Sequence, residues 1–222
     1  MSYLLQQELD SLKKYILDLG ALIEERLHQA DRSVIEKNSD IAKQVIKGDR
    51  EIDEKEVALE EEGLKLLALH QPVAIDLRFI VSILKINNDL ERIGDLIVNI
   101  SERSVFLAAY DDEPLLFDFA EMSNKVKEML SQSLDSLVNM DRDLAFRVCE
   151  MDDIVDSINS EMYKRVEQAI PENPDKVTLF QHQLSICNHL ERIADLATNI
   201  AEDVVYMIEG KIIRHKTEQF TD

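Results

Sequence analysis

The 222-residue chain contains little glycine, proline or cysteine, with five, four and two residues respectively. Because glycine and proline supply many of the special backbone conformations of turns, their scarcity predicts few turns and long elements between them. The two cysteines, Cys149 and Cys187, form no CxxC pair, so a cytoplasmic protein with reduced thiols is expected. No run of 18 apolar residues occurs, and polar residues interrupt positions 1–18, so neither a membrane span nor a signal peptide is expected.

Positive charge is also scarce, because 25 Lys and Arg stand against 45 Asp and Glu, for a net charge of −20. A protein that binds a nucleic-acid backbone needs a basic patch, so nucleic acid is not an expected partner. The same charge argues against direct adhesion to anionic lipid. Hydrophobic residues make up 45% of the chain, which is enough for a core in one compact domain or two small ones.

The spacing of apolar residues is helical. They follow one another at steps of three and four, as in Leu9, Leu12, Ile16, Leu19 and Ile23. Prolines mark the breaks between such segments: Pro72, Pro114, Pro171 and Pro174. The pattern predicts helices over residues 3–37, 40–69, 73–109, 114–139, 142–170 and 176–214. An all-α fold of two tandem antiparallel three-helix bundles follows, over residues 1–110 and 111–222.

An internal repeat supports this division. Residues 88–103 (NDLERIGDLIVNISER) and 188–203 (NHLERIADLATNIAED) are identical at ten of sixteen positions, at an offset of 100. Chance alone gives about one identity at average residue frequencies. The two halves therefore arose by duplication of one unit.

Two stripes run along the repeated helix at 100° per residue. The apolar stripe is the expected core face: Ile86, Leu90, Ile93, Ile97 and Ile100. The polar stripe lies nearly opposite and is identical in both halves: Asn88, Glu91, Asp95, Asn99 and Glu102, with Asn188, Glu191, Asp195, Asn199 and Glu202. A solvated face needs only to be polar, so the retention of these residue types indicates a shared role.

Metal binding is one such role. Glu91 and Asp95 lie one turn apart, with β-carbons about 5–6 Å from each other, and their carboxylates repel. A hard or borderline cation relieves that repulsion, but it needs several oxygen ligands, so a neighbouring helix must contribute. The middle helix of each half offers a second pair at the same spacing: Asp49 and Asp53 in the first, Asp152 and Asp156 in the second. Acidic pairs at this spacing are common in so acidic a chain, so a solvated charged face remains the alternative.

Other repeated residues have structural interpretations. Arg92 and Arg192 are expected to form outward ion pairs that contribute little. Gly94 and Ala194 are small residues beside the core stripe and are expected to allow close helix approach. His189 replaces Asp89 in the repeat and is expected to be a surface side chain.

Enzyme chemistry is not expected. A di-iron carboxylate bundle needs two inward Glu-x-x-His motifs, and only one occurs, from Glu25 to His28. The chain contains neither a glycine-rich phosphate loop nor a Gly-x-Ser-x-Gly motif. The cysteines lie among apolar residues, where buried and unreactive thiols are expected.

The repeated segments 89–102 and 189–202 resemble the signature of the PhoU family of phosphate-uptake regulators. Further segments are similar to other parts of that family: 48–53 (GDREID), 71–78 (QPVAIDLR) and 205–215 (VYMIEGKIIRH). The resemblance implies two tandem three-helix bundles and a cytoplasmic negative regulator of phosphate uptake and of the phosphate-starvation response. It also implies an adaptor, expected to be a homodimer, that links the ATPase subunit of a phosphate ABC transporter to a sensor histidine kinase.

Some members of that family bind iron or zinc on surface carboxylate motifs, and magnesium is also compatible with oxygen ligands. Carried over residue by residue, the implied metal ligands are Asp49, Asp53, Glu91, Asp95 and Asn99 in the first half, with Asp152, Asp156, Glu191, Asp195, Asn199 and Asp203 in the second. Asp203 has no acidic counterpart, because Arg103 takes its place in the first half. Two alternatives remain: a metal store of the same fold without a phosphate role, and a metal-dependent phosphatase.

Overall fold

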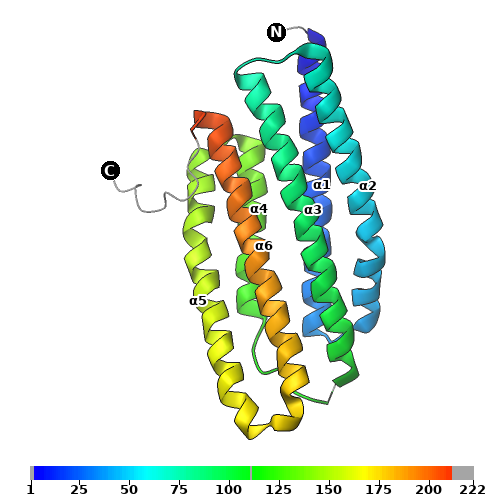
Figure 1. The fold of residues 1–222 in the computed structure, drawn as a ribbon, viewed down its shortest axis with the longest axis vertical. Coiled ribbons are helices and arrows are strands. Elements are labelled where there is room, and N and C mark those ends of the chain that lie inside the picture. The colour runs from blue at the N-terminus through cyan, green and yellow to red at the C-terminus, as the bar shows by residue number, and fades with distance from the viewer. Residues whose placement is uncertain (1–2, 111, 212–222) are drawn as a thin grey trace, which may run out of the picture.

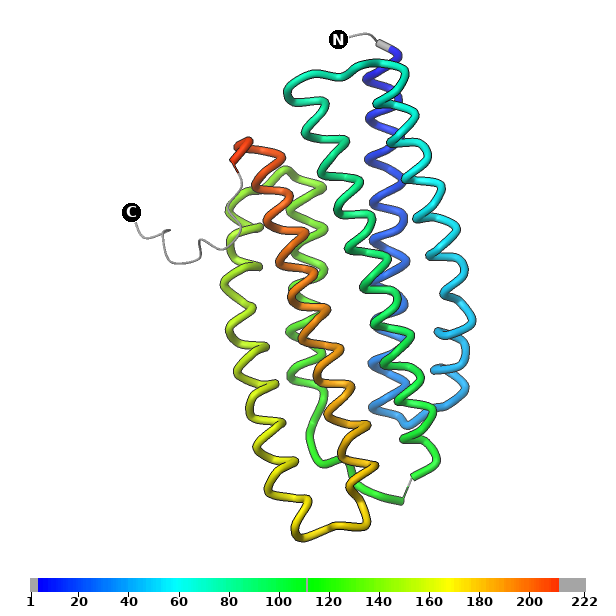
Figure 2. The backbone as a smooth tube through the Cα atoms, viewed as in Figure 1, coloured from blue at the N-terminus to red at the C-terminus, as the bar shows by residue number. Residues whose placement is uncertain are grey.

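The fold is all-helical in the computed structural model, which describes residues 3–110 and 112–211 (Figure 1). The α-helices are α1 (Tyr3–Ile35), α2 (Ser39–His70), α3 (Ile75–Leu107), α4 (Ala120–Asn139), α5 (Arg142–Glu172) and α6 (Val177–Glu209), with short 3₁₀ turns η1 (Ala108–Tyr110) and η2 (Pro174–Lys176). Each set of three helices runs up and down beside its neighbours, and no strand occurs in the described ranges (Figure 2). The predicted all-α architecture of two tandem three-helix bundles is confirmed.

Two predicted helix boundaries are wrong. The helix expected from residue 114 begins only at Ala120, because the segment before it crosses between the bundles. Phe117 and Phe119 are buried there, and the amide of Leu116 donates to Gln183 Oε1 at 2.7 Å. The helix expected to reach residue 214 ends at Glu209, where Gly210 adopts φ 70°, a conformation that favours glycine. Residues 212–214 lie outside the described ranges.

The apolar stripe of the repeat forms the core, as predicted. Ile86, Leu90, Ile93, Ile97 and Ile100 are at most 1% exposed. The small residue Gly94 allows the expected close approach, since a β-carbon there would lie 3.2 Å from Ile52 and 3.5 Å from Ile23. The core therefore joins α1, α2 and α3 through tightly packed aliphatic side chains.

The thiols of the two cysteines are also unreactive, as expected. Burial raises the pKa of Cys149 and of Cys187 to about 12. Both residues therefore remain protonated and poorly nucleophilic at neutral pH.

The two bundles pack together along α3 and α6, which lie antiparallel in the middle of the molecule (Figure 1). The Lys85 ammonium contacts Asp203 Oδ1 at 3.1 Å, and Arg103 Nε contacts Ser185 Oγ at 3.4 Å. The two contacts are equivalent in the repeat, because positions 85 and 103 correspond to positions 185 and 203 at the offset of 100. The halves are thus related by an approximate two-fold axis that crosses the seam between α3 and α6.

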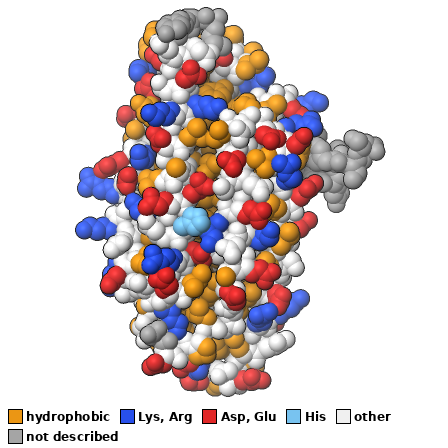
Figure 3. Space-filling model, turned by 180° about the vertical axis from the view of Figure 1, so that it is seen from behind, with side chains coloured by type: hydrophobic (Ala, Val, Ile, Leu, Met, Phe, Trp, Pro, Cys, Tyr) orange, Lys and Arg blue, Asp and Glu red, His pale blue; other side chains and the backbone are white. Residues whose placement is uncertain are grey.

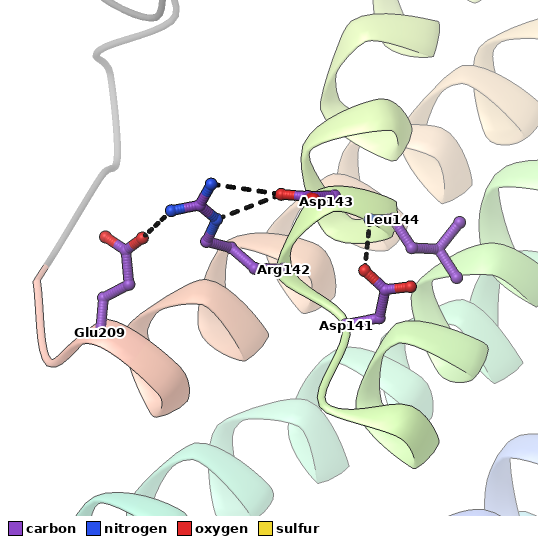
Figure 4. A network of polar contacts seen from close by, with 5 residues as sticks. All are labelled: Asp141, Arg142, Asp143, Leu144 and Glu209. Atoms are coloured by element: carbon purple, nitrogen blue, oxygen red, sulfur yellow. Dashed lines mark hydrogen bonds and ion pairs between the residues drawn. The ribbon is translucent and has the colours of Figure 1, made fainter.

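Further polar contacts tie the ends of the second bundle. Asp141 caps the start of α5 by accepting from the amide of Leu144 at 3.0 Å. The neighbouring Arg142 contacts Asp143 on its own helix and Glu209 at the end of α6, at 3.2 and 2.9 Å (Figure 4). These contacts set the position of α5 beside α6 at that end.

The face opposite that of Figure 1 mixes acidic, basic and apolar side chains (Figure 3). Over the described residues, none of the helices is both long and apolar enough for a bilayer crossing.

Candidate metal-binding site

A first acidic cluster lies between α2 and α3. We call it the α2–α3 cluster: Asp49, Asp53, Glu56, Glu91 and Asp95. Burial raises the pKa of Glu91, and the nearby carboxylates of Asp95, Glu56, Asp53 and Asp49 raise it further. Burial, followed by Asp53 and Asp95, likewise raises the pKa of Asp49. The predicted pairs on the two helices therefore do meet across the helix interface.

Glu56 was missed in the sequence, although it continues the stripe of Asp49 and Asp53 at i+7. Burial raises its pKa first, and then Glu60 and Asp53 raise it. Its carboxylate accepts from Asn87 Nδ2 at 3.1 Å. The helical period alone could have identified it.

A second acidic cluster occupies the matching place between α5 and α6. We call it the α5–α6 cluster: Asp152, Asp156, Glu191 and Asp195. Burial raises the pKa of Asp152 to about 6, with Asp195, Asp156, Asp153 and Glu191 as further causes. The pKa values of Glu191 and Asp195 are also raised, first by burial and then by neighbouring carboxylates, and Arg192 opposes both shifts. Here too the four predicted residues are brought together.

Two buried oxygen atoms on α5 have no hydrogen-bond partner among the described residues: Asp152 Oδ1 and Asn159 Oδ1. Asn159 lies 103 residues after Glu56, the offset that also relates Asp49 to Asp152. Buried oxygen atoms without donors suit a cation, since carboxylate and amide oxygens are ligands for hard metal ions. The donor set of the second half therefore fits a metal ion.

A complete metal site also requires that its ligands converge on one point. In the described part of the chain, no three His, Cys, Asp or Glu side chains already converge on one position where a metal could sit. The clusters are thus carboxylate-rich helix interfaces, and metal binding remains a prediction.

The remaining predicted ligands lie elsewhere. Asn99 donates to the carbonyl of Asp95 at 2.8 Å, and Asn99 and Asn199 line a hollow between α3 and α6. Asp203 is only 2% exposed and contacts Lys85 across the seam, so the structure does not bring it to the α5–α6 cluster. The position of Asp203 on α6 faces the other bundle, which the sequence of one helix does not reveal.

His189 is half-buried, so its prediction as a surface side chain is wrong. Its ring Nε2 lies 3.2 Å from Ser185 Oγ. Burial, followed by the charges of Arg103 and Arg192, lowers its pKa to about 4. His189 is therefore neutral at physiological pH and belongs to the contact between the bundles.

The raised pKa of Asp152 predicts a specific pH dependence of stability. The ordinary pKa of 3.8 rises to about 6 on folding, so the folded chain holds more protons between these values and loses stability as the pH rises through them. In metal-free protein, D152N should remove this loss, which amounts to about 1 kcal/mol after solvent screening. Urea unfolding at pH 4 and pH 7 measures the change.

The exposed Glu167 on the same helix provides the control, because E167Q should leave the pH dependence unchanged. An identical pH dependence in D152N and in the wild-type protein would show that the Asp152 carboxylate is not strained in this way.

Comparison with known proteins places the chain in a family. A PhoU domain matches it twice, over residues 16–104 and 119–204. The chain is 38% identical to the phosphate-specific transport system accessory protein PhoU homolog of Aquifex aeolicus, over 95% of each chain. It is 30% identical to the phosphate-specific transport system accessory protein PhoU of Escherichia coli, over 94% of this chain and 86% of that protein.

Solved structures agree with these matches. The crystal structure of PhoU from Pseudomonas aeruginosa has a TM-score of 0.90 at 32% identity, covering 93% of this chain and 99% of that one. The phosphate transport system regulatory protein PhoU from Streptococcus pneumoniae has a TM-score of 0.84 at 28% identity, covering 94% and 98%. With two domain matches, one in each bundle, and similarity over nearly its whole length, the chain belongs to the PhoU family.

Proposed function

We propose that this protein is a cytoplasmic negative regulator of phosphate uptake and of the phosphate-starvation response. It acts as an adaptor between the ATPase subunit of a phosphate ABC transporter and a sensor histidine kinase, and it functions as a homodimer. The observation that carries the proposal is similarity over nearly the whole chain to proteins named as accessory or regulatory proteins of phosphate transport. Those names describe no enzyme, and a role in binding rather than catalysis agrees with them.

Exposed apolar residues at one end of the first bundle support a role in protein binding. Leu69, Val73 and Ile75, around the connection from α2 to α3, are 65%, 73% and 68% exposed. At the offset of 100, Val73 and Ile75 match the polar residues Asn173 and Asp175, so the fold itself does not require apolar residues at these two positions. Exposed apolar surface of this kind marks contact sites on proteins.

The two acidic clusters supply the metal part of the proposal. Iron or zinc is the proposed ion, with magnesium as a further candidate. The proposed ligands are the carboxylates of the two clusters, with Asn159 in the second. A divalent ion in each cluster would contribute four positive charges against a net charge of −20 and would fix α2 to α3 and α5 to α6.

Deletion of the gene in its host tests the regulatory role. With an alkaline phosphatase reporter of the phosphate-starvation response, the deletion strain is expected to express the reporter in high phosphate. A plasmid copy of the wild-type gene should switch it off again. A silent reporter in a strain without a second PhoU-family gene would contradict the proposal.

The same deletion strain distinguishes the regulatory role from the alternative, a metal store without a phosphate role. It predicts that deletion changes cellular metal content while the reporter keeps its normal response. The unpartnered oxygen atoms of Asp152 and Asn159 are the observation that keeps this alternative open.

A further inference from the structure

A small hollow lies between α3 and α6, with a volume of 260 Å³. Each helix contributes the same four residue types to its wall: Arg92, Asp95, Leu96 and Asn99 from α3, with Arg192, Asp195, Leu196 and Asn199 from α6. The members of each pair are related by the offset of 100. The hollow therefore lies on the approximate two-fold axis that also relates the Lys85–Asp203 and Ser185–Arg103 contacts.

The two arginines are not explained by a shared ion pair. Arg92 lies 3.7 Å from Asp89 on its own helix. The residue that matches Asp89 in the second half is His189, which is neutral at physiological pH, so the acids near Arg192 are instead Glu191 and Asp195, whose raised pKa values it opposes. What Arg92 and Arg192 do share is the hollow.

The wall chemistry points to a small oxyanion. Two guanidinium groups and two carboxamides line the hollow, and one N–H of Asn99 already donates to the carbonyl of Asp95. The guanidinium group is suited to bidentate binding of tetrahedral oxyanions. A hollow of 260 Å³ is smaller than the pockets of about 300–1,000 Å³ that hold larger organic ligands. An adjoining groove of about 860 Å³ shares Arg92, Asp195 and Asn199 with the hollow and is open to solvent.

The carboxylates of Asp95 and Asp195 set a condition on anion binding, because they also line the hollow. Asp95 raises the pKa of Glu91 and of Asp49, and Asp195 raises that of Asp152, so each belongs to one of the acidic clusters as well. As free carboxylates they would repel an anion and compete for the arginines. A cation bound in each cluster would offset both effects.

We propose that the hollow binds one inorganic phosphate ion between Arg92 and Arg192, and that this binding requires a cation in each acidic cluster. The choice of phosphate among small oxyanions rests on the proposed role in phosphate regulation, and the cation requirement rests on the metal part of the same proposal. The protein would then respond directly to phosphate, through a ligand that contacts both bundles at their seam.

Equilibrium dialysis of the purified full chain with labelled phosphate tests this, in the presence and absence of magnesium ions. We expect one phosphate ion per chain with magnesium, and binding at least about tenfold weaker without it. The R92Q/R192Q variant should lose phosphate affinity by about tenfold or more, because it removes both charged donors. Its magnesium content, measured on the same samples by mass spectrometry, should equal that of the wild-type protein.

The matched control is R50Q/R165Q. These arginines lie on α2 and α5 and pair with Glu54 and Glu161 on their own helices, away from the hollow. This variant carries the same charge change and should bind phosphate like the wild-type protein.

The outcomes separate the two proposals. Phosphate binding that survives in R92Q/R192Q would place the ion on the metal alone and overturn the arginine site, while the metal proposal would stand. Normal magnesium content without any phosphate binding would have the same meaning. A chain that binds neither phosphate nor any of magnesium, zinc and iron would overturn both. Phosphate binding through the arginines without any cation would overturn the cation requirement.

Discussion

The variant E91Q/D95N/E191Q/D195N is expected to lose metal binding by about 100-fold or more, because it neutralises two carboxylates in each cluster. These residues come from α3 and α6 and face the acidic pairs of α2 and α5. The remaining acids, Asp49, Asp53 and Glu56 in the first half and Asp152 and Asp156 in the second, lie on one helix per cluster. A cation that had bridged two helices would then be held by one.

Metal analysis of the purified variant and the phosphatase reporter measure this together. If metal supports regulation, the variant should fail to silence the reporter in the deletion strain. The control E54Q/E61Q/E161Q/E167Q changes the net charge by the same four units at exposed positions on α2 and α5. Equal metal content in the variant, the control and the wild-type protein would eliminate the clusters as the metal site.

The fold was predictable because its main determinants are local. Helix number and order follow from the period of apolar residues and from proline positions. The core follows from the stripe that includes Leu90 and Ile97, both fully buried. The two errors at helix ends have local causes as well: Phe117 and Phe119 are core residues outside any helix, and Gly210 ends α6.

The polar stripe was harder to interpret, because a helical wheel describes one helix and not its neighbours. The stripe was predicted to lie nearly opposite the core, but it is divided between two contacts. Glu91 lies against α2, whereas Asn99 lies at the seam with α6. The positions of Asp203 and His189 depend on how the second bundle packs on the first, which no local pattern contains.

Glu56 and Asn159 show what further could have been found. Glu56 lies one turn beyond Asp53 on the same face of α2, and the offset of 103 then leads from Glu56 to Asn159. The repeat was therefore informative beyond the segment in which the residues are identical.

Reversing the charge of Asp203 is expected to cost about 3–5 kcal/mol, because D203R places a second cation beside the Lys85 ammonium at a position that is 2% exposed. The repeat itself suggests the rescue. At the matching position of the seam, Arg103 contacts Ser185, so K85S/D203R copies that pair. The guanidinium at position 203 would also lie at the end of the seam that contains Asp89, whereas Arg103 lies at the end that contains His189. The double variant should recover most of the lost stability.

Urea unfolding of the two single variants and the double variant measures the coupling between positions 85 and 203. The reciprocal set, R103D, S185K and their combination, should show the same pattern, because it copies the Lys85–Asp203 pair into the other end of the seam. A double variant no more stable than D203R would mean that the two ends are not equivalent. The approximate two-fold axis, on which the symmetric hollow of Arg92 and Arg192 depends, would then describe the backbone but not the chemistry of the seam.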